Sequence, residues 1–459
     1  MVMQGAHPGL TGGLTGPIQR VRWRTAPERA GRHAAVVATG GGASMDPRGA
    51  RPTGLTRRAF LQRSAVAGLG ITGLLGGLTS CRERTPSAGG GTPTPGLASP
   101  DNPVTLPLYD DVPAIADGLS PEAGPLRIFN WNDYIYKKVL KAFEAEYGVE
   151  IEYTQFAGMN EAMSKVQNDT VRFDLFFPTI ENLPKLVAAK KLQPLNLSYL
   201  PNLQNVWPQL RDPWYDRGAR YSVPYMTWKT GIGYRRDHVD DPGALDMPFD
   251  IYWDERWRGK VNLLDEYRET IGMALVRTGV PDMNTHDEQA IRAAGAALNE
   301  LNDLVDVKVA PGDYQKIAEG QAWVTYSWSG NMNYAQYYLP EGVGPEVLGF
   351  YYPPEGGWEV SNDLIVISSQ AESPVLAHHF INFLLDIDNG LTNFGYEGYQ
   401  PPFVGVTEAE WLKAGYIPEN LRTTIVTEQD FAKGQPILAL PPEIDQIYQD
   451  VWTEFKAGI

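Results

Sequence analysis

Short apolar strands alternate with helical patterns from residue 126 onward, and this alternation most constrains what the chain can fold into. The pattern opens with a strand at 126–131, followed by an apolar repeat at helical spacing that Gly148 ends. Further strands are predicted at 149–153, 173–177, 231–234, 260–264, 323–326 and 364–367, and helices at 161–166, 290–301 and 374–385. Such alternation predicts an α/β fold with a largely parallel sheet.

The N-terminal region carries the pattern of an export signal. Arg57 and Arg58 precede the apolar stretch 65–78, and Leu-Thr-Ser stands directly before Cys81, the only cysteine of the chain. The apolar stretch is short of the roughly 20 residues that cross a bilayer. The paired arginines resemble a twin-arginine signal, and the small residues before the cysteine resemble a bacterial lipobox. We therefore expect an extracytoplasmic protein, in the periplasm or on the outer face of the cell membrane, anchored through lipidated Cys81.

The segments that flank this signal show no apolar periodicity. Residues 1–44 predict either disorder or a start assigned upstream of Met45, where a conventional signal begins, and 1–80 together form the extension and signal peptide. Residues 82–105 are dominated by Pro, Gly, Ser and Thr, a composition that buries too little apolar surface to fold. We expect 81–125 to be a flexible tether between the lipid and the folded part.

Charge is distributed unevenly between the signal and the body of the protein. The formal net charge is −16, but residues 1–80 hold ten arginines and two acids, which leaves 29 basic against 53 acidic residues beyond them. A body this acidic repels phosphates and excludes nucleic acid as a partner. It weakly attracts cationic ligands at long range, with solubility as the alternative explanation of the charge.

The sequence lacks the motifs of common enzymes. No nucleophile elbow, phosphate-binding loop or zinc-protease motif occurs, and only four histidines follow residue 80. His378 and His379 are adjacent on a predicted helix, so they cannot chelate together, and a solvated helix face is expected for them. Glu266 and Glu269 could serve as the acid and base of a surface carboxylate-dependent hydrolase, but no nucleophile is evident. We expect no catalysis, metal or cofactor.

Aromatic residues stand beside carboxylates immediately after several predicted strands. Residues 131–134, 265–269 and 328–331 show this pattern. In open α/β sheets, ligands bind outside the carboxyl ends of the strands. Aromatic faces attract cations by about 0.5–2 kcal/mol each, and carboxylates accept charge-assisted hydrogen bonds from ammonium groups. The clusters suit a slender aliphatic amine, with core packing as the alternative role of each tryptophan.

Seven short sequence runs follow one another in a recognisable order between residues 129 and 458. They are FNWNDY at 129–134, FDLFFPT at 173–179, YSVPY at 221–225, RE at 268–269 with MAL at 273–275, EGG at 355–357, FINFLL at 380–385 and FKAG at 455–458. In this order they resemble the periplasmic spermidine/putrescine-binding proteins of polyamine ABC importers. The resemblance covers residues 126–458, nearly all of the part expected to fold.

This resemblance implies a two-lobed periplasmic-binding-protein-like α/β fold, with crossing hinge strands and a ligand cleft between the lobes. Lobe 1 would comprise 126–232 plus 363–405, and lobe 2 would comprise 233–362 plus 406–459. The implied function is that of an extracytoplasmic substrate-binding lipoprotein, which binds a putrescine- or spermidine-like polyamine and delivers it to the permease subunits of an ABC importer. The alternative within this fold is another small cationic or zwitterionic metabolite.

The resemblance also implies a set of ligand-binding residues. They are the wall aromatics Trp131, Tyr134, Trp328 and Tyr399, the small hydroxyl residue Thr179, the acids Glu266, Glu269 and Asp363, and the neighbours Asn132 and Glu181. Asp363 takes its place only with a one-residue insertion before it, and Asn362 takes that place without a gap. Glu181 stands where the spermidine binder has a wall tyrosine. Ser361 stands where the family has a tryptophan, with Trp358 nearby.

Overall fold

The computed structural model describes residues 97–310 and 312–458, which belong to one compact unit. The predicted export signal and Cys81 lie outside the described residues. Within the described ranges, none of the helices has both the length and the apolar character needed to span a bilayer.

Nine strands of the described chain form one sheet. The strands are β1 (Leu126–Trp131), β2 (Ile151–Phe156), β3 (Leu175–Phe176), β4 (Ser222–Arg235), β5 (Val261–Leu263), β6 (Lys308–Val309), β7 (Val324–Trp328), β8 (Leu348–Tyr351) and β9 (Val360–Ile367). Their order is β2-β1-β3-β9-β4-β7-β5-β6, and β8 pairs with β4. The pairs among β1, β2 and β3 and among β5, β6 and β7 are parallel. All pairs made by β4 and β9 are antiparallel, so the expected largely parallel sheet is in fact mixed.

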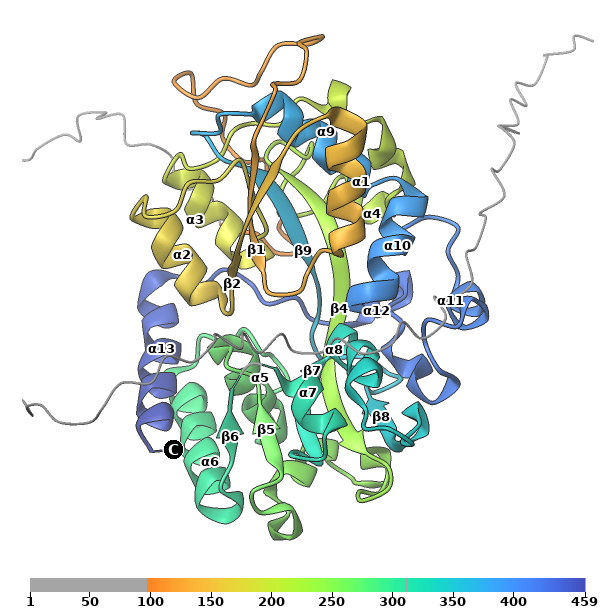
Figure 1. The fold of residues 1–459 in the computed structure, drawn as a ribbon. Helices are drawn as coiled ribbons and strands as arrows, with labels where there is room; N and C mark the ends of the chain where they lie inside the picture. The colour runs from red at the N-terminus through yellow and green to blue at the C-terminus, as the bar shows by residue number, and fades with distance from the viewer. Residues whose placement is uncertain (1–96, 311, 459) are drawn as a thin grey trace, which may run out of the picture. The chain divides into compact units, whose positions relative to one another are not determined.

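Thirteen α-helices of the described chain surround this sheet. They are α1 (Lys137–Tyr147), α2 (Met159–Gln167), α3 (Leu183–Ala188), α4 (Pro208–Arg211), α5 (Tyr267–Arg277), α6 (Glu288–Val305), α7 (Asp313–Ala318), α8 (Ser329–Ala335), α9 (Pro374–Leu384), α10 (Ile387–Glu397), α11 (Glu408–Ala414), α12 (Glu428–Lys433) and α13 (Pro442–Ala457). Figure 1 shows α1, α2, α3 and α9 around the β1–β2 part of the sheet, and α5, α6 and α7 around the β5–β6 part.

Strands β4 and β9 cross between these two parts. Residues 222–229 of β4 pair with β9, whereas residues 230–235 pair with β7 and β8. The two strands connect the two parts of the sheet and run antiparallel to every strand with which they pair, so the sheet as a whole is mixed. The register shifts between Pro224 and Thr227, where proline has no N–H to give to the ladder. This is the two-lobed fold with crossing strands that the resemblance implies.

Helix α6 illustrates how local sequence and core packing agree. The Asp287 side chain caps its start by accepting from two backbone N–H groups at 2.9 and 3.2 Å. Ile291, Leu298 and Val305 recur at helical spacing and are all fully buried. Each such apolar side chain contributes about 1.5–3 kcal/mol when it leaves water. The long lobe 2 helix is therefore fixed by its cap and by one apolar stripe.

The segment that precedes β1 packs against the folded body. Leu106 is fully buried, and its carbonyl accepts from Arg220 Nη1 at 2.7 Å. The Tyr221 hydroxyl donates to the Pro107 carbonyl at 2.6 Å. The prediction of a flexible tether over 81–125 is therefore wrong for residues 97–125. The proline-rich composition gave no indication that Leu106 would be buried, or that backbone carbonyls of this segment would accept hydrogen bonds from the folded body.

The expectation of a solvated histidine pair on α9 is also wrong for one member. His378 is fully buried. Its Nε2 accepts from the Asn196 N–H at 3.0 Å, and its Nδ1 donates to the Pro374 carbonyl at 2.7 Å. Burial lowers the pKa of His378. It is a neutral core histidine, whereas the neighbouring His379 is partly exposed.

Candidate functional site

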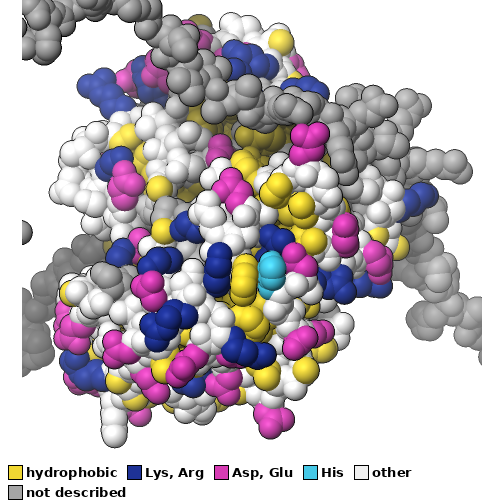
Figure 2. Space-filling view, turned by 60° about the horizontal axis from the view of Figure 1, so that its bottom comes forward, with side chains coloured by type: hydrophobic (Ala, Val, Ile, Leu, Met, Phe, Trp, Pro, Cys, Tyr) yellow, Lys and Arg dark blue, Asp and Glu magenta, His cyan; other side chains and the backbone are white. Residues whose placement is uncertain are grey.

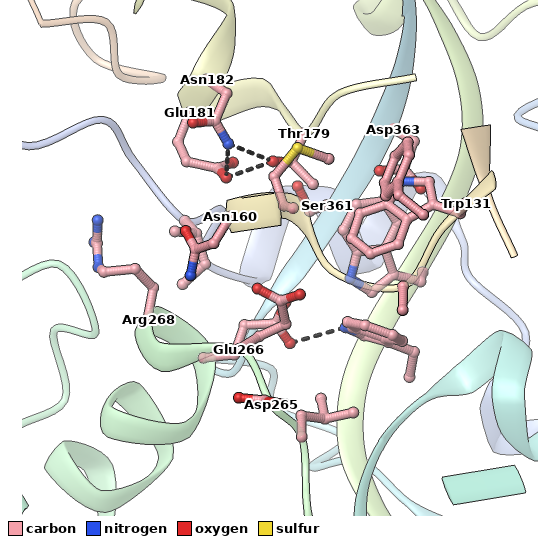
Figure 3. A pocket seen from close by; sticks show the side chains of 18 of the residues that line it. Trp131, Asn160, Thr179, Glu181, Asn182, Asp265, Glu266, Arg268, Ser361 and Asp363 are labelled. Atoms are coloured by element: carbon pink, nitrogen blue, oxygen red, sulfur yellow. Dashed lines mark hydrogen bonds between the residues drawn. The ribbon is translucent and has the colours of Figure 1, made fainter. Parts of the chain in front are cut away.

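A cavity of about 390 Å³ lies where the two parts of the sheet meet. Its walls come from the carboxyl ends of β1 and β7, the start of α5, helix α2 and the crossing strand β9 (Figure 3). The structure brings all ten residues of the predicted site to this cavity: Trp131, Asn132, Tyr134, Thr179, Glu181, Glu266, Glu269, Trp328, Asp363 and Tyr399. Their contact with a ligand stays a prediction.

Two indoles form an aromatic wall from opposite lobes. Trp131 ends β1 and Trp328 ends β7, and their rings meet edge to face with centroids 6.2 Å apart. Trp131 Nε1 donates to the Phe177 carbonyl at 3.1 Å, and Trp328 Nε1 donates to Glu269 Oε2 at 2.8 Å. Because the protein already satisfies both N–H groups, the ring orientations are fixed and the rings can offer faces and edges to a ligand.

Two tyrosines support the site beside this wall. The ring of Tyr134 meets that of Tyr399 edge to face at 5.0 Å, and the Tyr134 hydroxyl donates to Asp363 Oδ2. The Tyr399 hydroxyl donates to Asn331 Oδ1 at 2.8 Å. A Cβ at Gly330 would lie 2.4 Å from the Tyr399 ring, so only glycine lets this ring approach α8.

Asp363 differs from the other carboxylates of the site in its hydrogen bonding. It is 5% exposed, and its Oδ1 has no hydrogen-bond partner among the described residues. Burial and the nearby acids raise its pKa, and the Tyr134 hydroxyl opposes this shift only in part. Neighbouring strand residues face opposite sides, and Asn362 instead bonds the Tyr215 hydroxyl at 2.9 Å. With the one-residue insertion, the resemblance matches Asp363, which lines the cavity; without it, the match would be Asn362, which does not.

Glu181 lies in a small polar cluster on lobe 1. It accepts from the Thr179 hydroxyl and from Asn182 Nδ2, the latter at 2.7 Å. Figure 3 shows these three side chains grouped together on one side of the site. Burial raises the pKa of Glu181. The cluster holds the carboxyl in place where the resemblance expected a tyrosine.

Glu266 and Glu269 occupy the junction between β5 and α5. Glu266 is the N-cap residue of α5, and Glu269 lies on its first turn. Burial, with Glu181 and other acids nearby, raises the pKa of Glu266 to about 8. Burial and the neighbouring Glu359 raise the pKa of Glu269 well above its ordinary value.

Several acids of the cavity escaped the sequence reasoning. Glu359, Asp313 and Glu397 line the cavity, although none of them directly follows a predicted strand. Glu397 accepts from the Tyr399 N–H at 3.0 Å, and Asp313 accepts from Asn331 Nδ2 at 2.6 Å. A signal for Glu359 was present, because it stands four residues before Asp363, and strand residues two and four apart share a face.

A neighbouring strand brings an indole beside position 361, where the resemblance expected a tryptophan. Trp228 of β4 lies directly opposite Ser361 of β9, and both line the cavity. Trp358, the earlier candidate, stacks instead on Phe249 with centroids 3.8 Å apart, in the buried core of lobe 2. An indole therefore lines the cavity beside Ser361, although it comes from β4 and not from β9.

Acidic side chains dominate the cavity lining. Nine Asp and Glu side chains line it, against the two cations Lys185 and Arg268. Figure 3 shows Arg268 on the opposite side of the site from Asp363. By contrast, lysine and arginine side chains lie among acidic ones on the outer face in Figure 2. Within the described ranges, no group of three or more potential metal ligands is placed to hold an ion. The lining suits an organic cation.

A cleft of this kind, between lobes joined by crossing strands, defines a class of ligand-binding proteins. Residues 138–417 match the family described as bacterial extracellular solute-binding protein. The match spans more than half of the chain, and the chain belongs to this family.

Individual relatives extend the comparison over nearly their whole length. A putrescine/cadaverine-binding protein of Pseudomonas aeruginosa is 28% identical over 343 residues, 73% of this chain and 94% of the relative. The putrescine-binding periplasmic protein PotF of Escherichia coli is 25% identical, over 74% and 93%. The solved TpPotD lipoprotein of Treponema pallidum shares the fold, with a TM-score of 0.60, 22% identity, and coverage of 72% and 98%.

Proposed function

We propose that this protein is the extracytoplasmic substrate-binding component of an ABC importer, and that it binds a polyamine of the putrescine or spermidine kind. The observation that carries the proposal is the cavity itself, where nine carboxyl side chains and several aromatic rings surround a space of about 390 Å³. Relatives from Pseudomonas aeruginosa and Escherichia coli, named for binding putrescine, support it. On this proposal the protein acts by binding and delivery to permease subunits, without catalysis.

The proposed binding mode assigns a task to each part of the lining. One ammonium group binds the open Oδ1 of Asp363, and a second binds the carboxyls at the start of α5. The methylenes between them lie against Trp131 and Trp328. A hydrogen bond to a charged group contributes about 1.5–3 kcal/mol, and an aromatic face adds about 0.5–2 kcal/mol. The ligand closes the two lobes, 126–232 plus 363–405 and 233–362 plus 406–459.

We also propose that the protein is a lipoprotein exported by the twin-arginine route and anchored through Cys81. The sequence pattern before this sole cysteine supports the anchor. Cys81→Ser should release the protein from the membrane into the periplasm or medium, as fractionation and immunoblotting would show. A variant that stays bound to membranes after a high-salt wash would contradict the anchor.

A second ligand class has one observation in its favour. Arg268 and Lys185 line the cavity, and Figure 3 shows Arg268 on the side away from Asp363, where it could receive a carboxylate. A zwitterionic metabolite would place its amine on Asp363 and its carboxylate near these cations. Both cations are already engaged, because Arg268 donates to the Leu438 carbonyl at 3.0 Å and Lys185 pairs with Asp445 at 3.3 Å. The polyamine therefore remains the better proposal.

Titration calorimetry on the purified protein tests the choice. Putrescine, spermidine and an ω-amino acid of similar length are titrated separately at low ionic strength. The proposal expects heat and a raised unfolding midpoint with the polyamines, and a much weaker response to the amino acid. A response to the amino acid alone would favour the zwitterionic class, and silence with all amines would overturn the polyamine proposal.

A further inference from the structure

Two carboxyl groups from different elements meet at the floor of the cavity. Glu269 comes from the first turn of α5, and Glu359 stands directly before β9. Glu359 is 1% exposed and Glu269 is 9% exposed. The Thr230 hydroxyl lies 2.7 Å from Glu359 Oε2 and 3.4 Å from Glu269 Oε2, so it sits between the two groups. Trp328 Nε1 adds a donor to Glu269 Oε2 at 2.8 Å.

Arg268 faces the two carboxyls but forms no ion pair with either of them. Among the described residues, neither Glu269 nor Glu359 forms a salt bridge, although ion pairs occur elsewhere in the same lobe. Arg268 donates to the Leu438 carbonyl, and Lys229, next to Thr230, pairs with Asp430 at 3.3 Å. Both carboxyls lie within reach of the single Thr230 hydroxyl. Two buried negative charges so close together cannot both persist without a counter-charge, so one proton must stay on the pair.

We infer that Glu269 and Glu359 share a proton in the empty cavity, and that a cationic group of the ligand takes the place of that proton on binding. The inference rests on the proposed function and makes Glu359 a recognition residue. The carboxyl O–H bond breaks, the proton passes to solvent, and the ligand's ammonium keeps its own protons. Asp363, whose open Oδ1 lies at the same cavity, independently indicates a missing cationic partner.

The surroundings of the pair determine the direction of the pH dependence. From α5, Glu266 and Arg268 face it, and from lobe 1 Glu181 does. The other titratable neighbours are Tyr326 of β7, Tyr352 after β8, Tyr399 after α10 and Asp363 of β9.

Burial raises the pKa of Glu359 to about 7, and that of Glu269 lies well above its ordinary value. A bound cation lowers the pKa of both carboxyls. Binding therefore releases protons when the pH lies below the pKa values of the empty cavity. Affinity should therefore rise with pH, by about tenfold per pH unit for each proton released.

Calorimetry with putrescine in two buffers of different ionisation enthalpy measures the protons released, without any mutation. At pH 6.5 the wild-type protein should release about one proton or more per ligand. In Glu359→Gln the number should fall by about one, and the affinity rise between pH 5.5 and 7 should be less steep. Putrescine keeps its charge throughout, since aliphatic amines titrate near pH 10.

Glu355→Gln is the matched control, because Glu355 is exposed in the loop just before Glu359. It should release the same number of protons as the wild type. Equal release by the wild type and Glu359→Gln, or putrescine binding without any release, would overturn the inference and leave the proposed function intact. Absence of binding by any polyamine would overturn the proposed function itself. Unfolding midpoints without ligand show whether the variant is folded.

Discussion

Buried carboxylates occur in two regions of this molecule, and their surroundings differ sharply. Behind the sheet in lobe 1, Asp216 accepts from three backbone N–H groups and from the Ser222 hydroxyl, at 2.8 to 3.2 Å. Asp174 accepts from three backbone N–H groups in the same way. In the cavity, Asp363 has one donor, the Tyr134 hydroxyl, and an oxygen without any.

The number of hydrogen-bond donors distinguishes acids with a structural role from acids that are available to a ligand. A buried polar group normally finds its partners within the protein, and leaving one unpaired costs about 1–3 kcal/mol. Asp216 follows this rule, so its task is to tie the loop before β4. Asp363 does not follow it, because its Oδ1 has no donor among the described residues. Glu269 and Glu359 have donors but share the Thr230 hydroxyl and form no ion pair in the described part of the chain, so a bound cation would stabilise all three acids. Local violations of this kind are expected at functional sites.

The largest effect that tests this comparison is on stability. Asp216→Ala leaves three backbone N–H groups without their acceptor, so the free energy of unfolding should fall by about 3 kcal/mol or more. Chemical denaturation would measure the loss. Polyamine affinity under folding conditions should stay within about twofold of the wild type.

The exposed Asp246 gives the matched control, and Asp246→Ala should leave stability nearly unchanged. If Asp216→Ala proved neutral for stability yet weakened binding, the division into structural and ligand-binding acids would be wrong.

Asp363→Asn should show the opposite behaviour. The change keeps the shape of the side chain and removes its charge, so polyamine affinity should fall roughly 10- to 100-fold, which corresponds to about 1.5–3 kcal/mol. Without ligand, the unfolding midpoint should stay the same or rise, because a buried charge with too few donors is lost. Asp246→Asn is the control in calorimetry. A variant that binds normally but unfolds earlier would make Asp363 a structural residue.

A smaller effect concerns the pH dependence of the empty protein. The pKa of Glu266 is about 8 in the folded protein and lies near its ordinary value of 4.5 in the unfolded chain. Between these values the folded state binds more protons, so the contribution of Glu266 to stability falls as pH rises from about 4.5 to 8.

Thermal unfolding without ligand at several pH values tests this expectation. Glu266→Gln should raise the midpoint relative to the wild type at pH 8, by roughly 2–4 °C, and leave it similar at pH 5. A difference that is the same at both pH values would show that the ionisation of Glu266 is not responsible. Saturating polyamine should reduce the difference between the two midpoints at pH 8. A bound cation favours the ionised form of the Glu266 carboxyl, so ionisation no longer destabilises the wild-type protein.

The sequence predicts the regular elements well where periodicity is strong. The strand at 126–131 coincides with β1, and the helices at 290–301 and 374–385 lie within α6 and α9 apart from Leu385. It is least informative where a strand is only two residues long, as in β6, or where a segment is buried in both lobes, as in β4. Residues 231–234 are only the end of β4, because its earlier part has no alternating pattern and is buried throughout.

For the site, the residue pattern indicates only the clusters after strands, whereas the resemblance implies ten ligand-binding residues, and the structure brings all ten to one cavity. For Glu359 it offers only the spacing of four residues before Asp363, and it does not indicate Asp313 or Glu397, because the position of these two at the cavity depends on how the lobes meet. The position of Trp228 in the cavity lining, opposite Ser361, depends on strand register, which no local pattern reveals.

The smallest expected effect concerns closure of the cleft, at a contact far less buried than either group of carboxylates. The Tyr314 hydroxyl of lobe 2 donates to Asp133 Oδ2 of lobe 1 at 3.4 Å, at the exposed edge of the cavity. Tyr314→Phe removes this bond and keeps the ring. A long, solvent-exposed hydrogen bond contributes about 0.5 kcal/mol, so affinity should fall only about twofold. The loss should lie mainly in faster ligand release, which stopped-flow fluorescence can measure. Tyr351→Phe removes a hydroxyl that belongs to β8 of lobe 2, outside the cavity lining, and should leave the release rate unchanged. A tenfold or larger loss in Tyr314→Phe would mean that this hydroxyl contacts the ligand, and that recognition extends from the buried acids to the edge of the cleft.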